Sequence, residues 1–219
     1  MSTQNKTVIR LATATLLAAL AHDAGAFDTS ALTMRVRVIN IAPADGSDPV
    51  GALAVPGNSI DVESKWAPDI DFEYALTPHV GLELLLTVPQ RHEVVARQTA
   101  LGPNVSLGTV QHLPPTLTAK YYFLTNGVRP YVGAGVNFTW FTDDDLAVRA
   151  AGINKLDIDR TSVGLALQAG VDISLAGKWS LSLDAKKADI STDVKLNGTK
   201  LTTVSVDPYI YGIGLGYRL

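Results

Sequence analysis

Large apolar residues alternate with small or polar ones along most of this chain, and this period of two constrains its fold more than any other feature. The C-terminal segment Tyr209–Leu219 shows it most clearly. Tyrosine, isoleucine or leucine stands at each odd position, and glycine stands at three of the even positions between them. Successive side chains of a strand point to opposite faces of the sheet. The segment is therefore predicted to be a strand with one large apolar face and one face of small or polar residues.

Seven further segments carry the same alternation and have the length of a tilted strand that crosses a bilayer, about 8–12 residues. They lie near residues 34–41, 69–76, 80–88, 117–123, 132–140, 163–173 and 179–186. Past the N-terminal segment, no window of about 18 residues is continuously apolar, so no transmembrane helix is expected there. A chain that crosses a membrane with strands must close them into a barrel, because every backbone polar group has to be satisfied in lipid. The predicted fold class is all-β: an eight-stranded antiparallel up-and-down transmembrane β-barrel.

The connections between these segments alternate strictly between short and long. Tight turns are expected at residues 77–79, 126–127 and 176–177, and long links at about 42–61, 89–114, 142–160 and 190–204. Outer-membrane barrels have this asymmetry, with short periplasmic turns and long outer loops. A soluble, lipocalin-like barrel would instead place its large apolar residues inside. We therefore expect a protein of the outer membrane of a Gram-negative cell, with both termini in the periplasm.

Residues 1–26 have the features of a secretory signal peptide. Two basic residues precede the apolar stretch Leu11–Ala21, which is too short to span a bilayer. Ala24 and Ala26 supply the small side chains that signal peptidase requires. The alternative is an amphipathic N-terminal helix of a soluble protein. We assign residues 27–219 to the outer-membrane barrel.

Composition and motifs exclude several classes of function. The chain has no cysteine, which excludes a disulfide scaffold and a thiol nucleophile, and its net charge of −3 without a basic stripe argues against nucleic-acid binding. His92 and His112 flank Ser106, but no spacing specifies a catalytic Ser–His pair. The three consecutive acids Asp143–Asp145 could attract a divalent cation, but adjacent residues rarely point the same way. We expect no enzyme, no cofactor and no metal site.

Four blocks of sequence are distinctive: VGLELLLTVPQRHEV at Val80–Val94, HLPPTLTAKYYF at His112–Phe123, RPYVGAGVNFTWF at Arg129–Phe141 and VDPYIYGIGLGYRL at Val206–Leu219. Together they resemble the OmpW family, which includes the alkane-import porin. The resemblance covers nearly all of the mature chain. The first strand and loops 1, 3 and 4 depart from the pattern, and Leu219 replaces the usual final aromatic residue. The resemblance implies a narrow, largely apolar lumen and passive uptake of small hydrophobic molecules. It also implies that these molecules can be released laterally into the bilayer. The implied partners are the outer-membrane bilayer, these solutes, periplasmic chaperones and the barrel-assembly machinery.

Strand directions give each lumen-facing residue an approximate depth. Near the periplasmic end the predicted charged plug consists of Arg35, Arg37, Glu73, Glu83, Lys120, Arg129, Asp172 and Arg218. Buried charges are costly unless paired, so Lys120 and Arg218 are expected to neutralise its carboxylates. Further out, the predicted apolar lumen contains Ile39, Leu85, Asn137, Thr139 and Ile210. A hydrophobic solute would be stopped above the plug. The alternative is an interior that is packed and purely structural.

Three prolines mark a candidate lateral exit between the third and fourth predicted strands. Pro89, Pro114 and Pro115 fall at the outer ends of these two neighbouring strands. Proline has no N–H, so the hydrogen-bond ladder between the strands must be interrupted there. The simpler interpretation is that the prolines only end the strands before a long loop.

Three functions remain open from the sequence. The first is a passive channel for small hydrophobic compounds. The second is a structural or adhesion-type anchor whose long outer loops bind external partners, and the third is a lipid-modifying barrel enzyme.

Overall fold

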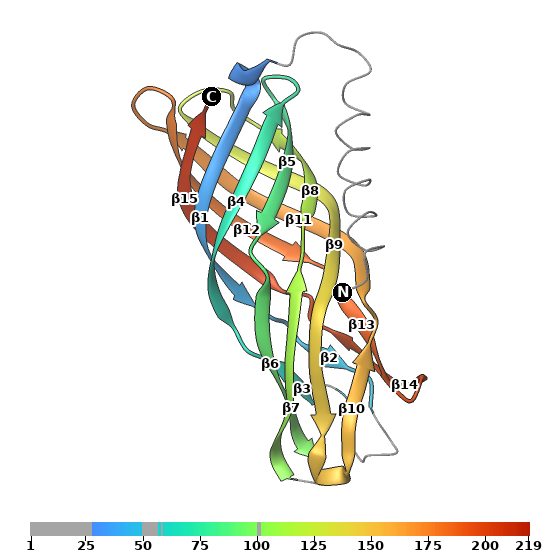
Figure 1. The fold of residues 1–219 in the computed structure, drawn as a ribbon. Helices are drawn as coiled ribbons and strands as arrows, with labels where there is room; N and C mark the ends of the chain where they lie inside the picture. Colours follow the sequence, from blue (N-terminus) through green and yellow to red (C-terminus); the bar gives the residue numbers. More distant parts are fainter. Residues whose placement is uncertain (1–27, 50–56, 58, 100–101) are drawn as a thin grey trace.

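Eight antiparallel strands close a barrel in the computed structural model, which describes residues 28–49, 57, 59–99 and 102–219 (Figure 1). They are β1 (Leu32–Ala42), β4 (Lys65–Ala75), β5 (Val80–Thr87), β8 (Thr116–Tyr122), β9 (Val128–Val148), β11 (Thr161–Ser174), β12 (Trp179–Ala188) and β15 (Tyr209–Arg218). Strand β15 pairs with both β12 and β1 and so closes the barrel. The predicted fold class is confirmed. The predicted signal peptide lies outside the described residues.

Short turns join β4 to β5, β8 to β9 and β11 to β12 at one end of the barrel, called here the turn end. Gly127 and Gly177 have φ angles of 64° and 65°. Glycine adopts this left-handed backbone without the steric cost that a side chain brings. The chain also enters and leaves the barrel at this end, because Thr33 of β1 pairs with Arg218 of β15.

The long links at the opposite end contain strands, although the sequence predicted loops. The additional strands are β2 (Gly46–Ser47), β3 (Ile60–Val62), β6 (Gln90–Thr99), β7 (Gly102–Leu113), β10 (Ile153–Ile158), β13 (Ser191–Leu196) and β14 (Thr199–Ser205). Short 3-10 helices form at η1 (Thr29–Ala31) and η3 (Arg149–Ala151). Strand β9 has 21 residues and continues from the barrel into this region. Together these strands form a second body of sheet beyond the barrel, called here the extension (Figure 1).

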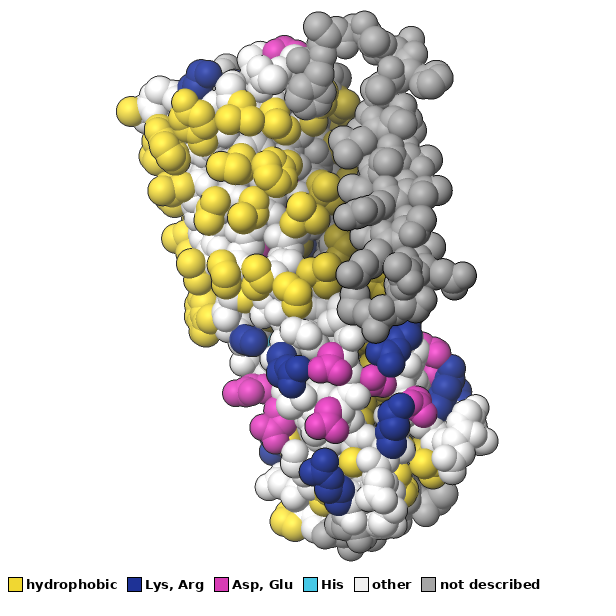
Figure 2. Space-filling model, in the orientation of Figure 1, with side chains coloured by type: hydrophobic (Ala, Val, Ile, Leu, Met, Phe, Trp, Pro, Cys, Tyr) yellow, Lys and Arg dark blue, Asp and Glu magenta, His cyan; other side chains and the backbone are white. Residues whose placement is uncertain are grey.

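The outer surface of the barrel is apolar and the surface of the extension is charged. Lipid-facing side chains such as Leu165 and Ile213 are 66% and 52% exposed, as the alternation predicts. Figure 2 shows rows of apolar side chains as a band over the visible face of the barrel, with acidic and basic side chains on the extension next to it. Trp66 and Trp179 lie exposed near opposite edges of this band, where aromatic belts meet the membrane interface. In the described part of the chain, no helix is long and apolar enough to span a membrane.

Candidate functional site

Charged side chains fill the barrel interior nearest the turn end and form one buried network. Arg35 lies 2.9 Å from Asp71, 3.0 Å from Glu73 and 2.7 Å from Asp172, and is 1% exposed. Arg37 lies 3.1 Å from both Asp69 and Asp71. Buried charges persist only where partners and hydrogen bonds replace the lost water. Each arginine therefore stabilises a group of carboxylates that come from other strands.

Two lysines neutralise the carboxylate of β5 from different sides of the lumen. Lys120 lies 3.1 Å from Glu83 and 2.8 Å from Glu73, and Lys186 lies 3.0 Å from Glu83. The Lys120 ammonium also lies 3.8 Å from the centre of the Tyr131 ring. These contacts link β4, β5, β8, β9 and β12 across the barrel. The network therefore spans the lumen between these strands, and we call it the plug.

Small residues on β15 leave room for the arginines of the plug. Gly214 pairs with Arg37 and Gly216 pairs with Arg35 across the β1–β15 ladder. A Cβ atom at Gly214 would lie 2.6 Å from Arg37 Cγ, closer than real side chains approach. The glycine face of the last strand therefore allows long cationic side chains to lie flat against it.

The structure brings together six of the eight predicted plug residues: Arg35, Arg37, Glu73, Glu83, Lys120 and Asp172. Arg129 is half-buried at the mouth of the turn end, with its guanidinium 4.0 Å from the centre of the Tyr122 ring. The expectation for Arg218 was wrong. Its side chain is exposed at the same mouth and forms no ion pair with any described residue. As the last paired residue of β15, it lies too near the rim, and Arg35 neutralises Asp172 instead.

Several plug residues were missed at the sequence level, although the alternation places them on the inward face. They are Asp69, Asp71, Tyr122, Tyr131, Asp184 and Lys186. The Tyr122 hydroxyl lies 2.8 Å from carboxylate oxygens of both Glu73 and Asp172, and the Tyr131 hydroxyl donates to Asp184 at 2.7 Å. The signal was available for the charged members, because Asp69, Asp71, Asp184 and Lys186 each stand between lipid-facing residues.

Beyond the plug, the lumen has one apolar and one polar side, and we call this level the neck. Ile39, Ile41 and Ala67 are buried together with Ile210 packed against them, and Leu85 is also buried. On the polar side, Thr139 donates to Asn137 at 2.6 Å, and Asn137 donates to the Thr116 hydroxyl at 2.9 Å. The five residues predicted for the apolar lumen therefore line this neck. Asn137 and Thr139 form its polar side and are hydrogen-bonded to each other.

The ladder between the third and fourth barrel strands is interrupted at the level of the neck. Strands β5 and β8 are paired as far as Leu85 and Thr116, and pairing resumes between β6 and β7 at Gln90 and His112. Residues 86–89 and 113–115 between these pairs include Pro89, Pro114 and Pro115. We call this break the seam gap. The candidate exit residues therefore lie on both sides of an interruption in the hydrogen-bond ladder.

Polar side chains satisfy backbone carbonyls that the seam gap leaves without strand partners. The Gln90 amide donates to the Val88 carbonyl at 2.8 Å, and the Asn137 amide lies 3.4 Å from the Pro114 carbonyl. The Pro115 carbonyl, in contrast, faces the neighbouring strand β9 and accepts from the backbone N–H of Phe138 at 2.9 Å. Unsatisfied backbone groups cost several kcal/mol in lipid, on the order of a lost hydrogen bond or more. The gap is thus stabilised without closing the ladder.

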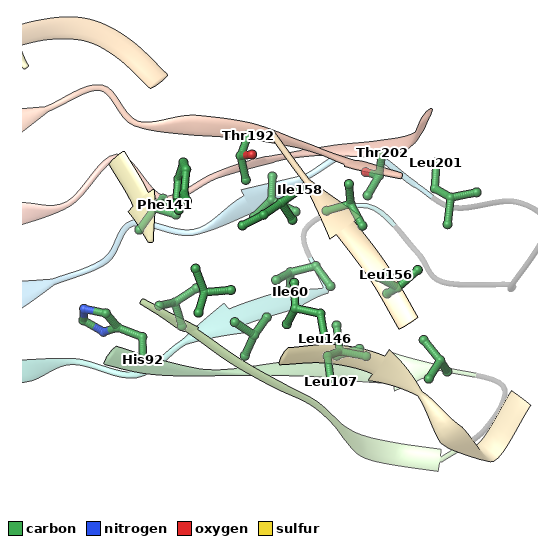
Figure 3. Close-up of a pocket in the computed structure, with 18 of the residues that line it drawn as sticks. Ile60, His92, Leu107, Phe141, Leu146, Leu156, Ile158, Thr192, Leu201 and Thr202 are labelled. Carbon is green, nitrogen blue, oxygen red and sulfur yellow. The ribbon is translucent and has the colours of Figure 1, made fainter. Parts of the chain in front are cut away.

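The extension encloses an apolar pocket beyond the neck (Figure 3). It contains about 1060 Å³ of empty space, part of which is open to solvent. Its walls include Ile60, Val94, Leu107, Val110, Phe141, Leu146, Val148, Leu156, Ile158, Val194, Leu201 and Val204. These side chains come from strands of four separate links, and many of them form the largest apolar core of the described chain. The sequence predicted none of them as site residues.

Two histidines form the end of the pocket nearest the barrel. The rings of His92 and His112 are stacked with centroids 5.1 Å apart, and Phe141 packs against His112 at 6.1 Å. His92 Nδ1 lies 3.0 Å from the Glu63 carbonyl oxygen. Burial lowers the pKa of His92, and burial, the neighbouring His92 ring and the charge of Lys65 together lower the pKa of His112 to about 4. Both rings are therefore neutral near pH 7.

The other residues considered at the sequence level lie apart from this pair. Ser106 is on the outer face of the extension, where its hydroxyl donates to Glu93 at 2.9 Å. Asp143 and Asp144 form ion pairs with different arginines, Arg91 at 2.8 Å and Arg160 at 3.2 Å. The structure therefore does not bring Ser106 to the histidines, and it turns the adjacent acids toward different partners.

Comparison with known proteins agrees with this architecture. The sequence profile of the OmpW family matches residues 28–219. Outer membrane protein W of Escherichia coli is 35% identical over 221 residues, which cover 97% of this chain and 98% of the relative. The dibenzothiophene metabolism operon protein PahQ of Pseudomonas aeruginosa is 29% identical over 194 residues, covering 86% of this chain and 89% of the relative.

The barrel is also similar to a solved structure. The crystal structure of the outer membrane protein OprG from Pseudomonas aeruginosa superposes with a TM-score of 0.74, at 29% identity over 86% of this chain and 95% of that chain. The chain belongs to the OmpW family of outer-membrane β-barrel proteins.

Proposed function

We propose that this barrel mediates passive uptake of small hydrophobic molecules across the outer membrane. The observation that carries the proposal is the apolar pocket of the extension, which ends at the neck beside the seam gap. Burial of apolar surface contributes about 25 cal/mol per Å², so such a pocket attracts apolar solutes without a specific polar contact.

The plug indicates how such a solute would travel. Arg35, Glu83 and Lys120 are fully buried on the barrel axis, and an apolar molecule cannot replace their ionic partners. Movement along the axis is therefore unfavourable. The seam gap between residues 86–89 and 113–115 offers a sideways path, and we propose that the solute leaves through it into the bilayer.

This path implies an orientation for the protein. The turn end and both ends of the mature chain would lie in the periplasm, and the extension would lie outside the cell, as in barrels with short periplasmic turns. The pocket would then meet solutes first. The name of the relative PahQ, which refers to a dibenzothiophene metabolism operon, supports an aromatic or otherwise apolar cargo.

A pocket-filling variant tests the proposal. Ala96 is 3% exposed and lines the pocket, whereas its neighbour Val95 does not. We expect Ala96→Phe to reduce uptake of naphthalene by intact cells to the level of cells without the barrel, and Val95→Phe to preserve uptake. Equal naphthalene uptake by wild-type cells and cells lacking the barrel would contradict the proposal. In that case, binding of external partners by the extension becomes the better interpretation.

A further inference from the structure

A second cavity lies at the mouth of the turn end and is lined mainly by polar and charged residues. It contains about 580 Å³ of empty space, part of which is open to solvent. Its walls include the cationic side chains of Arg35, Arg129, Lys178 and Arg218 and a single carboxylate, that of Asp172. We call it the mouth cavity. Its excess of positive charge favours an anion.

Arg129 has no carboxylate partner in this cavity. It stands opposite Asp172 in the ladder between β9 and β11. Asp172, however, lies 2.7 Å from Arg35 and accepts a hydrogen bond from the Tyr122 hydroxyl at 2.8 Å. The Arg129 guanidinium stacks on the Tyr122 ring instead, and its Nε atom is buried without a hydrogen-bond partner among the described residues. The charge of Arg129 is therefore available to an anion from outside the protein.

Lys178 and Arg218 bring two further cations to the rim of the mouth cavity. The backbone N–H of Arg218 donates to the Lys178 carbonyl at 3.0 Å, so the two residues are neighbours. Both side chains are exposed, and neither forms an ion pair with any residue that the structure describes. Like charges on neighbouring residues repel each other, and an anion bound near them offsets this repulsion.

An apolar groove on the lipid-facing surface of the barrel begins next to the mouth cavity. Trp179 lines both of them, and the groove extends from it along β1 and β15 past Met34, Val36 and Leu215. The Trp179 ring packs edge-on against Tyr217, with the ring centroids 4.9 Å apart. Such aromatic residues lie at the depth where lipid headgroups meet acyl chains. A cationic cavity and an apolar groove that share one wall residue match the two parts of a phospholipid.

We propose that the mouth cavity and this groove together bind one anionic phospholipid of the leaflet that the turn end meets. Its phosphodiester contacts Arg129 and Lys178, with Arg218 at the rim, and an acyl chain lies in the groove. Basic pockets at the ends of membrane-spanning segments recognise anionic headgroups in this way. A zwitterionic lipid carries its own cation beside the phosphate and gains less, and a free phosphate leaves the groove without a ligand. The site lies at the opposite end of the barrel from the apolar pocket, so the inference does not depend on the proposed uptake.

Lipid retention by the purified barrel tests this inference. Native mass spectrometry counts the lipids that the protein keeps from micelles with equal amounts of dioleoyl-phosphatidylglycerol and dioleoyl-phosphatidylcholine. We expect the wild-type protein to keep one phosphatidylglycerol with a preference of about tenfold or more. The preference disappears in the double variant Arg129→Gln/Lys178→Gln. The matched control is Arg149→Gln/Lys155→Gln, which removes the same charge from exposed residues of the extension and keeps the preference.

Equal retention of the two lipids by the wild-type protein, or an unchanged preference in the double variant, overturns the inference. An equal loss in the control variant also overturns it, because net charge then decides retention. NMR of the wild-type protein in phosphatidylcholine nanodiscs covers the case in which the variant does not fold. We expect the backbone amide resonances of Gly177 and Lys178 to shift when phosphatidylglycerol is added and to stay in place with inorganic phosphate. Unmoved resonances with the lipid reject the inference, and equal shifts with inorganic phosphate assign the mouth cavity to a free anion instead.

Discussion

Arg35 Nη2 lies 2.7 Å from Asp172 Oδ2 and so joins the first strand of the barrel to β11 across the lumen. The same guanidinium contacts Asp71 and Glu73. One cation thus contacts three carboxylates of two different strands, two of which it shares with Arg37 and Lys120. Substitution of Arg35 is therefore expected to destabilise the plug strongly.

The first prediction concerns the stability of the plug. Arg35→Met should lower the free energy of unfolding by about 3–5 kcal/mol, because it leaves buried carboxylates without their cation. Arg218→Met is the matched control, since this arginine is exposed at the mouth, and its effect should stay within about 0.5 kcal/mol. Urea unfolding in lipid vesicles measures both. Equal effects of the two substitutions would show that the network does not stabilise the barrel.

The contrast between these two arginines shows what alternation can and cannot predict. It gives the face of each residue reliably, because lipid imposes one environment on one side of every strand. Leu165 and Ser182 obey it, at 66% and 0% exposure. Alternation does not predict which partner a lumen-facing side chain can contact. Arg218 faces the lumen side but lies at the rim, and the ion pair expected for it is formed by Arg35.

The pocket could not be predicted for a different reason. Its walls come from β3, β6, β7, β9, β10, β13 and β14, which are short or continue other strands, and no single segment has an obvious binding motif. The hairpins become a pocket only when they pack together. The interrupted ladder beside Pro89, Pro114 and Pro115 was easier to predict from the sequence, because a missing N–H is a local property of the residue.

The second prediction concerns pH. The pKa of His112 in the folded protein is about 4, below its value near 6.5 in an unfolded chain. As the pH falls through 6.5, the unfolded chain takes up a proton that the folded pocket refuses. The stability of the extension should therefore be greatest above pH 6.5 and decrease down to about pH 4, by on the order of 3 kcal/mol from this group.

The control for this prediction is His112→Phe. The charged group that lowers the pKa of both histidines is Lys65, and it is unchanged in this variant. We expect the difference in unfolding free energy between wild type and His112→Phe to vary from pH 7.5 to pH 4.5. A difference that stays constant across this range would show that His112 titrates normally.

The third prediction concerns orientation. An epitope tag inserted after Asn197, in the tight turn between β13 and β14, should be labelled on intact cells, because the extension is proposed to lie outside. A tag after Asn126, in the turn between β8 and β9, should be labelled only after the outer membrane is permeabilised. Surface labelling at Asn126 on intact cells would reverse the proposed orientation.

The most direct measurement of the central account is a reversible cross-link over the seam gap. The chain has no native cysteine, so Val88→Cys and Leu113→Cys give one thiol on each side of the break. A short reducible bis-maleimide would hold the two sides together in the folded protein. We predict that naphthalene uptake falls to the level of cells without the barrel and returns when the linker is cleaved. Unchanged uptake at complete cross-linking would contradict lateral exit through this gap.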